Sequence, residues 1–177
     1  MIDRARGIFP GAWRNPLRHH MGPNVLPGFR LAIIQEASVK ITDFTTTNVG
    51  TAQQVLTQNV YMSTAEICLY VFASFVVEHT VAGATFDARL HLGIDDGPSA
   101  EYLIAELPGI YLATANRNFP VHISIGLNIK ANLPLVTRPG NRRVGLYVIN
   151  NTAGTLTVPS SNNVNPVLHL FVAGDAT

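Results

Sequence analysis

Cysteine, charge and long apolar runs are all scarce in this sequence of 177 residues. The single cysteine, Cys68, excludes an intrachain disulfide framework and a zinc site built from several cysteines. The longest apolar stretch, residues 67–77, is much shorter than the about 20 residues of a membrane-spanning helix, so we expect no membrane partner. Residues 1–30 lack the apolar segment of a signal peptide, and we therefore expect no cleaved secretion signal.

Charged residues make up 13% of the chain, about half the usual share, although 47% of the residues are hydrophobic. The 12 Lys+Arg and 11 Asp+Glu residues are unevenly distributed, because residues 1–30 hold five arginines and one aspartate. The same segment contains four prolines and four glycines and shows neither helical nor strand periodicity. We predict an extended N-terminal arm over residues 1–36, followed by one domain over residues 37–177.

The arm carries apolar and aromatic residues that ordinary disordered tails lack, and such anchors indicate a docking segment. Arginine and aromatic residues are enriched in protein interfaces. The net charge of +4 over residues 1–30 is small for a segment that packages nucleic acid, so we expect a protein partner and not nucleic acid. The residues predicted to bind that partner are Arg4, Arg6, Phe9, Trp13, Arg14 and Arg18.

Short β-branched runs separated by turn residues follow the arm and predict an all-β domain. Apolar and polar residues alternate clearly over 84–94, 121–130 and 143–149, which is typical of half-buried antiparallel strands. We expect further strands near residues 38–46, 53–58, 65–78, 101–106 and 166–173, and a hairpin that joins 143–149 to 155–158 through an Asn-rich turn. The predicted fold is an antiparallel two-sheet β-sandwich, jelly-roll-like, with an extended N-terminal arm.

The predicted strand at 65–78 differs from the others because both of its faces are apolar. One face suits the core of the sandwich, whereas the other needs a cover, either the arm or a neighbouring subunit. An ordinary central strand overlaid by a loop is the alternative. We predict an oligomer interface on the second face, formed by Cys68, Tyr70, Phe72 and Val76.

Asp87, Arg89 and His91 share one face of a predicted strand, where they form either an acid–base site or an internal ion pair on a polar surface. No nucleophile or cofactor-binding motif accompanies them, so we favour the ion pair and expect no catalytic site and no cofactor. Asp95 and Asp96 are oxygen donors in a turn, but the spacing of a calcium loop is missing. We expect no metal site.

The combination of a mildly basic, proline-rich arm and a Thr/Asn-rich sandwich, with the hairpin texture of residues 144–158, resembles jelly-roll virion structural proteins. Two groups match: decoration or cement proteins of bacteriophage capsids, and single jelly-roll coat proteins. The first implies a homotrimer that is made in the host cytoplasm and docks on a major capsid protein or another virion protein. The second implies a subunit that forms the shell itself. We therefore expect a non-enzymatic protein located in the virion.

Two other classes remain open from the residues alone. A carbohydrate- or receptor-binding domain of a fibre tip would use exposed aromatic and amide side chains near loops, and the candidates are Tyr102, Tyr111, Asn116 and Asn118. A cupin-like enzyme would need several histidines that converge on a metal, and the candidates on strands are His91, His122 and His169.

Overall fold

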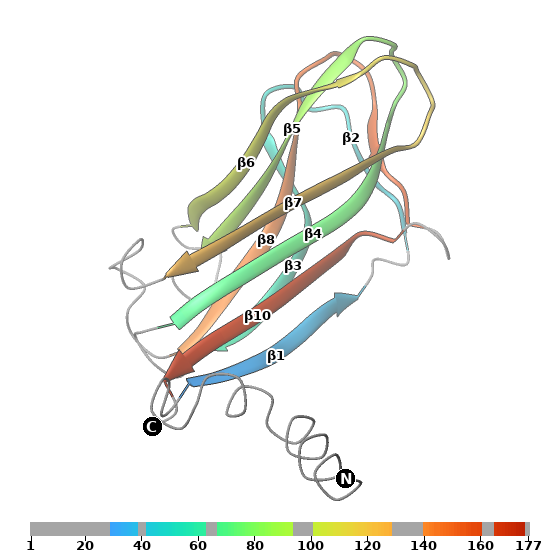
Figure 1. Ribbon diagram of the computed structural model, residues 1–177. Helices are drawn as coiled ribbons and strands as arrows, with labels where there is room; N and C mark the ends of the chain where they lie inside the picture. Colours follow the sequence, from blue (N-terminus) through green and yellow to red (C-terminus); the bar gives the residue numbers. More distant parts are fainter. Residues whose placement is uncertain are drawn as a thin grey trace, which may run out of the picture.

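The computed structural model describes residues 29–38, 42–62, 67–93, 101–128, 140–160 and 165–175. Within these ranges the chain consists of strands and connecting turns, and it contains no apolar helix long enough to cross a membrane. The strands form two antiparallel sheets that pack face to face, as the alternating sequence patterns predict (Figure 1). The all-β sandwich is therefore confirmed.

One sheet has the strand order β1-β10-β4-β9-β2, with β7 also paired to β4. The other has the order β3-β8-β5-β6. The strands, in chain order, are β1 (Phe29–Ser38), β2 (Phe44–Thr46), β3 (Ala52–Met62), β4 (Ile67–His79), β5 (Ala84–Gly93), β6 (Glu101–Leu112), β7 (Phe119–Asn128), β8 (Gly140–Asn150), β9 (Leu156–Val158) and β10 (Val167–Asp175).

The long strands pair in a nested manner, from the ends of the chain towards its middle. β1 pairs with β10, β3 with β8, β4 with β7 and β5 with β6, each pair antiparallel. This is the pattern of one long antiparallel ribbon rolled into two sheets, which defines a jelly roll. In Figure 1, β7, β4, β10 and β1 lie side by side in front of the second sheet.

The core lies between the sheets and is built from alternate residues of each strand. In β5 every second side chain from Ala84 to Leu92 is completely buried, and the residues between them point outward. Leu69, Val71 and Phe75 on β4 close the core from the opposite sheet. Because the side-chain period of a strand is two, this burial fixes which residues of each strand face outward.

The structure corrects the predicted start of the sandwich. Residues 29–36, which we assigned to the arm, belong to β1 and pair with β10 along their length. A register shift between Ile33 and Gln35 interrupts the alternation, so the sequence of this strand shows no regular period. Residues 1–28 lie outside the described residues.

The predicted hairpin between residues 143–149 and 155–158 is wrong. β9 pairs with β2 and β4 in the opposite sheet, and not with β8. The turn after β8 crosses between the sheets, and within it the buried side chain of Asn150 donates a hydrogen bond to the carbonyl of Gly154 (3.0 Å). After this turn the side chains of Leu156 and Val158 enter the core.

A buried polar network holds the loops at this end of the sandwich. The N–H of Val81 donates to Nδ1 of His79 (2.9 Å), which leaves Nε2 to donate to Oδ1 of Asn150 (3.2 Å). The same Oδ1 accepts a hydrogen bond from the N–H of Thr152 (3.1 Å). Gly154 packs so tightly that an added Cβ would lie 2.8 Å from Cε1 of His79. The loops that follow β4 and β8 are thereby joined in one unit.

We expect Asn150→Ala to lower the free energy of unfolding by about 1–3 kcal/mol, because it leaves the buried Nε2 of His79 and the N–H of Thr152 without their acceptor. Urea denaturation of the full chain measures this change. The matched control is Asn151→Ala, which removes an exposed hydrogen bond to Asp87 and should cost less than about 1 kcal/mol. Equal losses in the two variants would contradict the assigned role of the network.

Candidate functional site

The central rows on the outward side of β10, β4 and β7 form a continuous surface without Asp, Glu, Lys or Arg, which we call the uncharged face. Its middle strand contributes residues that alternate with the buried core positions of β4. The partners in register on β10 and β7 complete the surface on both sides. The members of the uncharged face are Tyr70, Phe72, Ser74, Val76, His122, Ser124, Gly126, Val167, His169 and Phe171.

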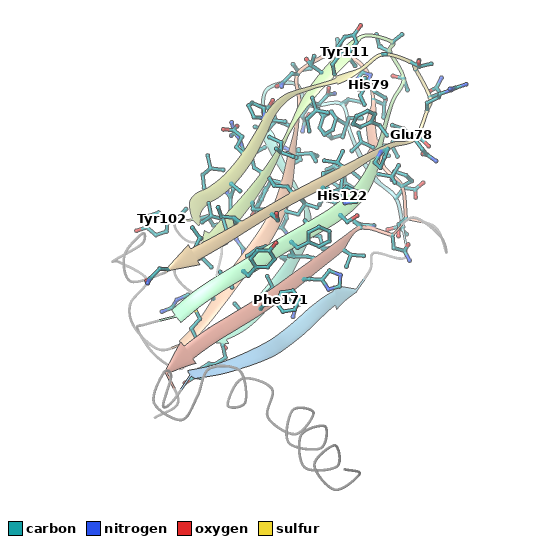
Figure 2. All side chains as sticks on the ribbon, viewed as in Figure 1. Glu78, His79, Tyr102, Tyr111, His122 and Phe171 are labelled. Atoms are coloured by element: carbon teal, nitrogen blue, oxygen red, sulfur yellow. The ribbon has the colours of Figure 1, made fainter. Side chains whose placement is uncertain are left out.

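Phe72 lies at the centre of this face, between two histidines. Its ring stacks on His122 with 6.0 Å between centroids and an interplanar angle of 15°, and it lies 5.9 Å from the ring of His169 on the other side. Tyr70 makes an edge contact with Phe171 (6.0 Å). His122 and Phe171 are labelled on this surface in Figure 2. Cross-strand contacts therefore order the aromatic groups before any partner binds.

Tyr70 remains 47% exposed, although its strand is central in the sheet. Phe72 and Val76 are half-buried on the same face. These three predicted interface residues are therefore brought together on one outward surface. Cys68 occupies the register position two residues before Tyr70 in β4, and its side chain lies outside the described residues. The use of this surface between subunits stays a prediction.

Charges occur at the margins of the uncharged face. Glu36 on β1 holds the register position next to His169, and Glu78 lies near the end of β4. The predicted partner-binding residues of the arm, Arg4, Arg6, Phe9, Trp13, Arg14 and Arg18, lie outside the described residues.

The opposite sheet presents a different surface, on which charges pair with one another. Arg89 on β5 contacts Glu106 on β6 (2.6 Å) and lies 3.9 Å from Asp87. Asp87 also accepts hydrogen bonds from the N–H of Gly109 and the side chain of Asn151, both 2.8 Å long. The predicted ion pair on this strand is confirmed, and the carboxylate of Asp87 serves the structure of two neighbouring segments.

His91 belongs to a second group on this sheet that the sequence did not reveal. Its Nδ1 lies 3.3 Å from Glu101, and Glu101 also accepts hydrogen bonds from the guanidinium of Arg143. The ring of His91 stacks on Tyr147 at 4.5 Å, in a space left by Gly145, where a Cβ would lie 2.5 Å from the tyrosine ring. The alternation of β8 places Arg143 and Tyr147 outward, but only the pairing of β8 with β5 brings them to His91.

This environment alters the acid–base behaviour of the group. Burial lowers the pKa of His91 and outweighs the hydrogen bond and charge of Glu101; the ring's Nε2 is buried without a partner among the described residues. Burial opposes ionisation of Glu101, but hydrogen bonds from Tyr147 and Arg143 and the charge of Arg143 hold its pKa below the ordinary value. Burial and the carboxylate of Glu101 raise the pKa of Tyr147 to about 12.

The charged side chains of these two groups thus pair with other side chains of the same sheet. His91 lies on one sheet, whereas His122 and His169 lie on the outer face of the other, so these three histidines do not converge. In the described ranges no three His, Cys, Asp or Glu side chains come together in a way that would hold a metal ion. Asp95 and Asp96 lie outside those ranges. The uncharged face is therefore the better candidate for a functional site.

No protein-family model and no curated protein matches this chain. Among solved structures, a chain of the T13 viral particle of infectious bursal disease virus matches with a TM-score of 0.49 and 13% identity, over 86% of this chain and 37% of the viral chain. Eiger TNF from S. frugiperda matches with a TM-score of 0.47 and 10% identity, over 85% of this chain and 96% of its own. The xylan-binding module CBM15 matches with a TM-score of 0.41 and 13% identity, over 81% and 90%.

This chain therefore spans well under half the length of the viral chain that it resembles. The matches include virion proteins, the class suggested by the sequence, and the resemblance is one of architecture only. One fold can serve many functions, so the sandwich by itself does not define the function of this protein.

The lowered pKa of His91 predicts how stability depends on pH. The unfolded chain binds a proton at His91 near pH 6.5, whereas the folded chain binds it only at lower pH. The stability contributed by neutral His91 is complete above about pH 6.5 and is lost as the pH falls towards the folded-state pKa. We expect His91→Gln to lose less unfolding free energy than the wild type between about pH 7.5 and about pH 5.5 in urea titrations. An unchanged pH dependence in the variant would contradict this account.

Proposed function

We propose that this protein is a non-enzymatic virion structural protein that assembles with copies of itself through the uncharged face. The observation that carries the proposal is the surface around Phe72, where aromatic residues gather and Asp, Glu, Lys and Arg are absent. Protein interfaces show this depletion of charge and enrichment of aromatic residues at their centres. A sheet surface of this kind left open to water also favours aggregation, so a cover by another subunit stabilises the protein.

The place of β1 in the fold supports a second contact within the virion. Residues 1–28 precede β1 in the chain, and β1 is the edge strand next to β10 in the sheet that carries the uncharged face. The Arg and aromatic residues of this N-terminal segment suit a protein surface. We propose an auxiliary capsid protein, of the decoration or cement type, that forms a homotrimer and docks on a major capsid protein through this segment.

A shell-forming coat protein is the second candidate, and the nested jelly-roll pairing favours it because single jelly rolls build many viral shells. Assembly of the purified full chain, followed by electron microscopy, separates the two candidates. Closed particles formed by this protein alone support the coat protein. Small oligomers of defined mass support the auxiliary protein.

The substitution Phe72→Asp tests the uncharged face. A charge at its centre would have to be buried against the partner, so we expect the oligomer to dissociate into monomers while circular dichroism still shows a folded sandwich. Light scattering coupled to gel filtration measures the mass. The matched control is Tyr61→Asp on β3 of the other sheet, a tyrosine that is 57% exposed, which should leave the oligomer intact. An unchanged mass for Phe72→Asp would refute the interface.

Deletion of residues 1–28 tests the docking segment and leaves β1 complete, since this strand begins at Phe29. We expect the truncated protein to fold and to form the same oligomer as the full chain. It should no longer bind virus particles that lack this protein, as measured by co-sedimentation. Co-sedimentation equal to that of the full chain would show that residues 1–28 are not the docking segment.

A further inference from the structure

The loops at one end of the sandwich form a fixed platform, which we call the tip: residues 47–51, 80–83, 113–118 and 151–155. Backbone hydrogen bonds connect all four loops to neighbouring elements. Gly50 donates to the carbonyl of Asn150 (2.8 Å), Thr80 to that of Thr155 (3.0 Å) and Asn116 to that of His79 (2.8 Å). The buried network of His79 and Asn150 lies directly beneath. The tip is therefore held in one arrangement, which lowers the entropic cost of binding a ligand.

Two groups of polar side chains at the tip differ in their hydrogen bonding. Those of Thr80, Asn151 and Thr152 are used within the fold, because each makes a hydrogen bond to another segment. Those of Asn48, Asn116 and Asn118 are exposed and make no hydrogen bond in the described part of the chain. Three amide groups, each with donors and an acceptor, are thus presented to solvent.

Tyr111 supplies an aromatic surface at the same end of the sandwich, next to the loop 80–83 (Figure 2). It is the next-to-last residue of β6, 60% exposed, and its hydroxyl lies 3.5 Å from the position that a Cβ would take at Gly83. Gly83 has a φ of +76° and donates its N–H to the carbonyl of Leu112 (2.8 Å), so the turn is held against the tyrosine. Figure 2 shows Tyr111 at the tip and Tyr102 towards the other end of β6. Of the two tyrosines that the sequence suggested for a carbohydrate site, only Tyr111 lies at the end of the sandwich where the Asn-containing loops are found (Figure 2).

We propose that the tip binds a neutral glycan, with Tyr111 stacked on a sugar ring and the amides of Asn116 and Asn118 hydrogen-bonded to its hydroxyl groups. Ten of the twenty tip residues are Thr or Asn, and one, Arg117, is charged. Uncharged donors and acceptors at the same end of the sandwich as an exposed aromatic ring suit a ligand that has many hydroxyl groups and no charge. The proposal rests on the tip alone and is independent of assembly through the uncharged face.

Exposed apolar side chains at the tip, those of Val49 and Val81, would equally suit contact with a protein. The exposed amide groups favour the glycan over a protein. A protein partner would need hydrogen-bonding groups at fixed positions opposite these amides, whereas each sugar ring carries hydroxyl groups on several sides. The absence of acidic residues from the tip loops also makes a cationic partner a poor match.

The test is binding of the full-length protein to a printed array of glucose-, mannose- and galactose-terminated oligosaccharides, with sialylated and sulfated counterparts on the same array. We expect neutral oligosaccharides to bind and the acidic counterparts to bind no better. Titration calorimetry with the best-bound neutral oligosaccharide then compares variants. Repeating the array with the Phe72→Asp protein separates a failure of glycan binding from a failure of assembly.

Tyr111→Ala should lower the affinity at least about tenfold, as expected for an aromatic anchor at the centre of a site. Tyr111→Phe keeps the ring and should stay within about threefold of the wild type. Asn116 has a φ of +51°, which Asp also tolerates, so Asn116→Asp preserves the shape and backbone of this residue. Because the substitution removes the amide donor, it should also weaken binding. Tyr61→Ala is the control, because this tyrosine is similarly exposed and lies at the opposite end of the sandwich.

Three results would overturn the proposal: no neutral oligosaccharide binds, acidic oligosaccharides bind more tightly, or Tyr111→Ala binds as the wild type does. A change in the mass of the oligomer on Tyr111→Ala, without glycan binding by the wild type, would identify the tip as a contact between protein subunits instead.

Discussion

The position of β4 between β10 and β7 is the constraint on which the rest of the structure depends. Its inward residues close the core against the second sheet, and its outward residues bring Tyr70 and Phe72 beside His122, His169 and Phe171. Because the side chains of a strand alternate, a one-residue shift in the register of β4 would displace both faces at once. The same strand ends in His79, whose hydrogen bonds hold the loops of the tip. The core, the proposed interface and the tip therefore share one element.

The few charged side chains of the chain are unevenly distributed between the outer surfaces of the two sheets. Charged side chains that the structure describes on the outer surface of β5, β6 and β8 pair with one another, including Arg89 with Glu106 and Arg143 with Glu101. The outer surface of β10, β4 and β7 carries none in its central rows. The outer surfaces of the two sheets thus differ in charge. The charged surface is suited to contact with water, whereas the uncharged surface is suited to contact with another protein.

Strands with unbroken alternation could be predicted from the sequence with nearly correct bounds, whereas strands with bulges were missed or predicted too short. β5 and β7 were found with nearly correct bounds because each has a regular period of two. The sequence pattern places residues 29–36 of β1 in the arm because the register shift near Ile33 hides the period of this strand. The predicted end of β6 was too early because Pro108 and Gly109 lie opposite Asp87 as a bulge inside the strand, where Asp87 accepts the N–H of Gly109.

The same limit applies to the sites. The outward apolar residues of β4 could be predicted from the sequence of that strand alone. The histidines beside Phe72 could not, because they belong to β7 and β10, and only the strand order shows that these strands flank β4. The most direct test of the central claim is the native mass of the full-length protein at micromolar concentration, measured by native mass spectrometry. We expect a small multiple of the 19.1 kDa chain, and a trimer for the auxiliary protein. A monomer as the main species would contradict the uncharged face as a subunit interface.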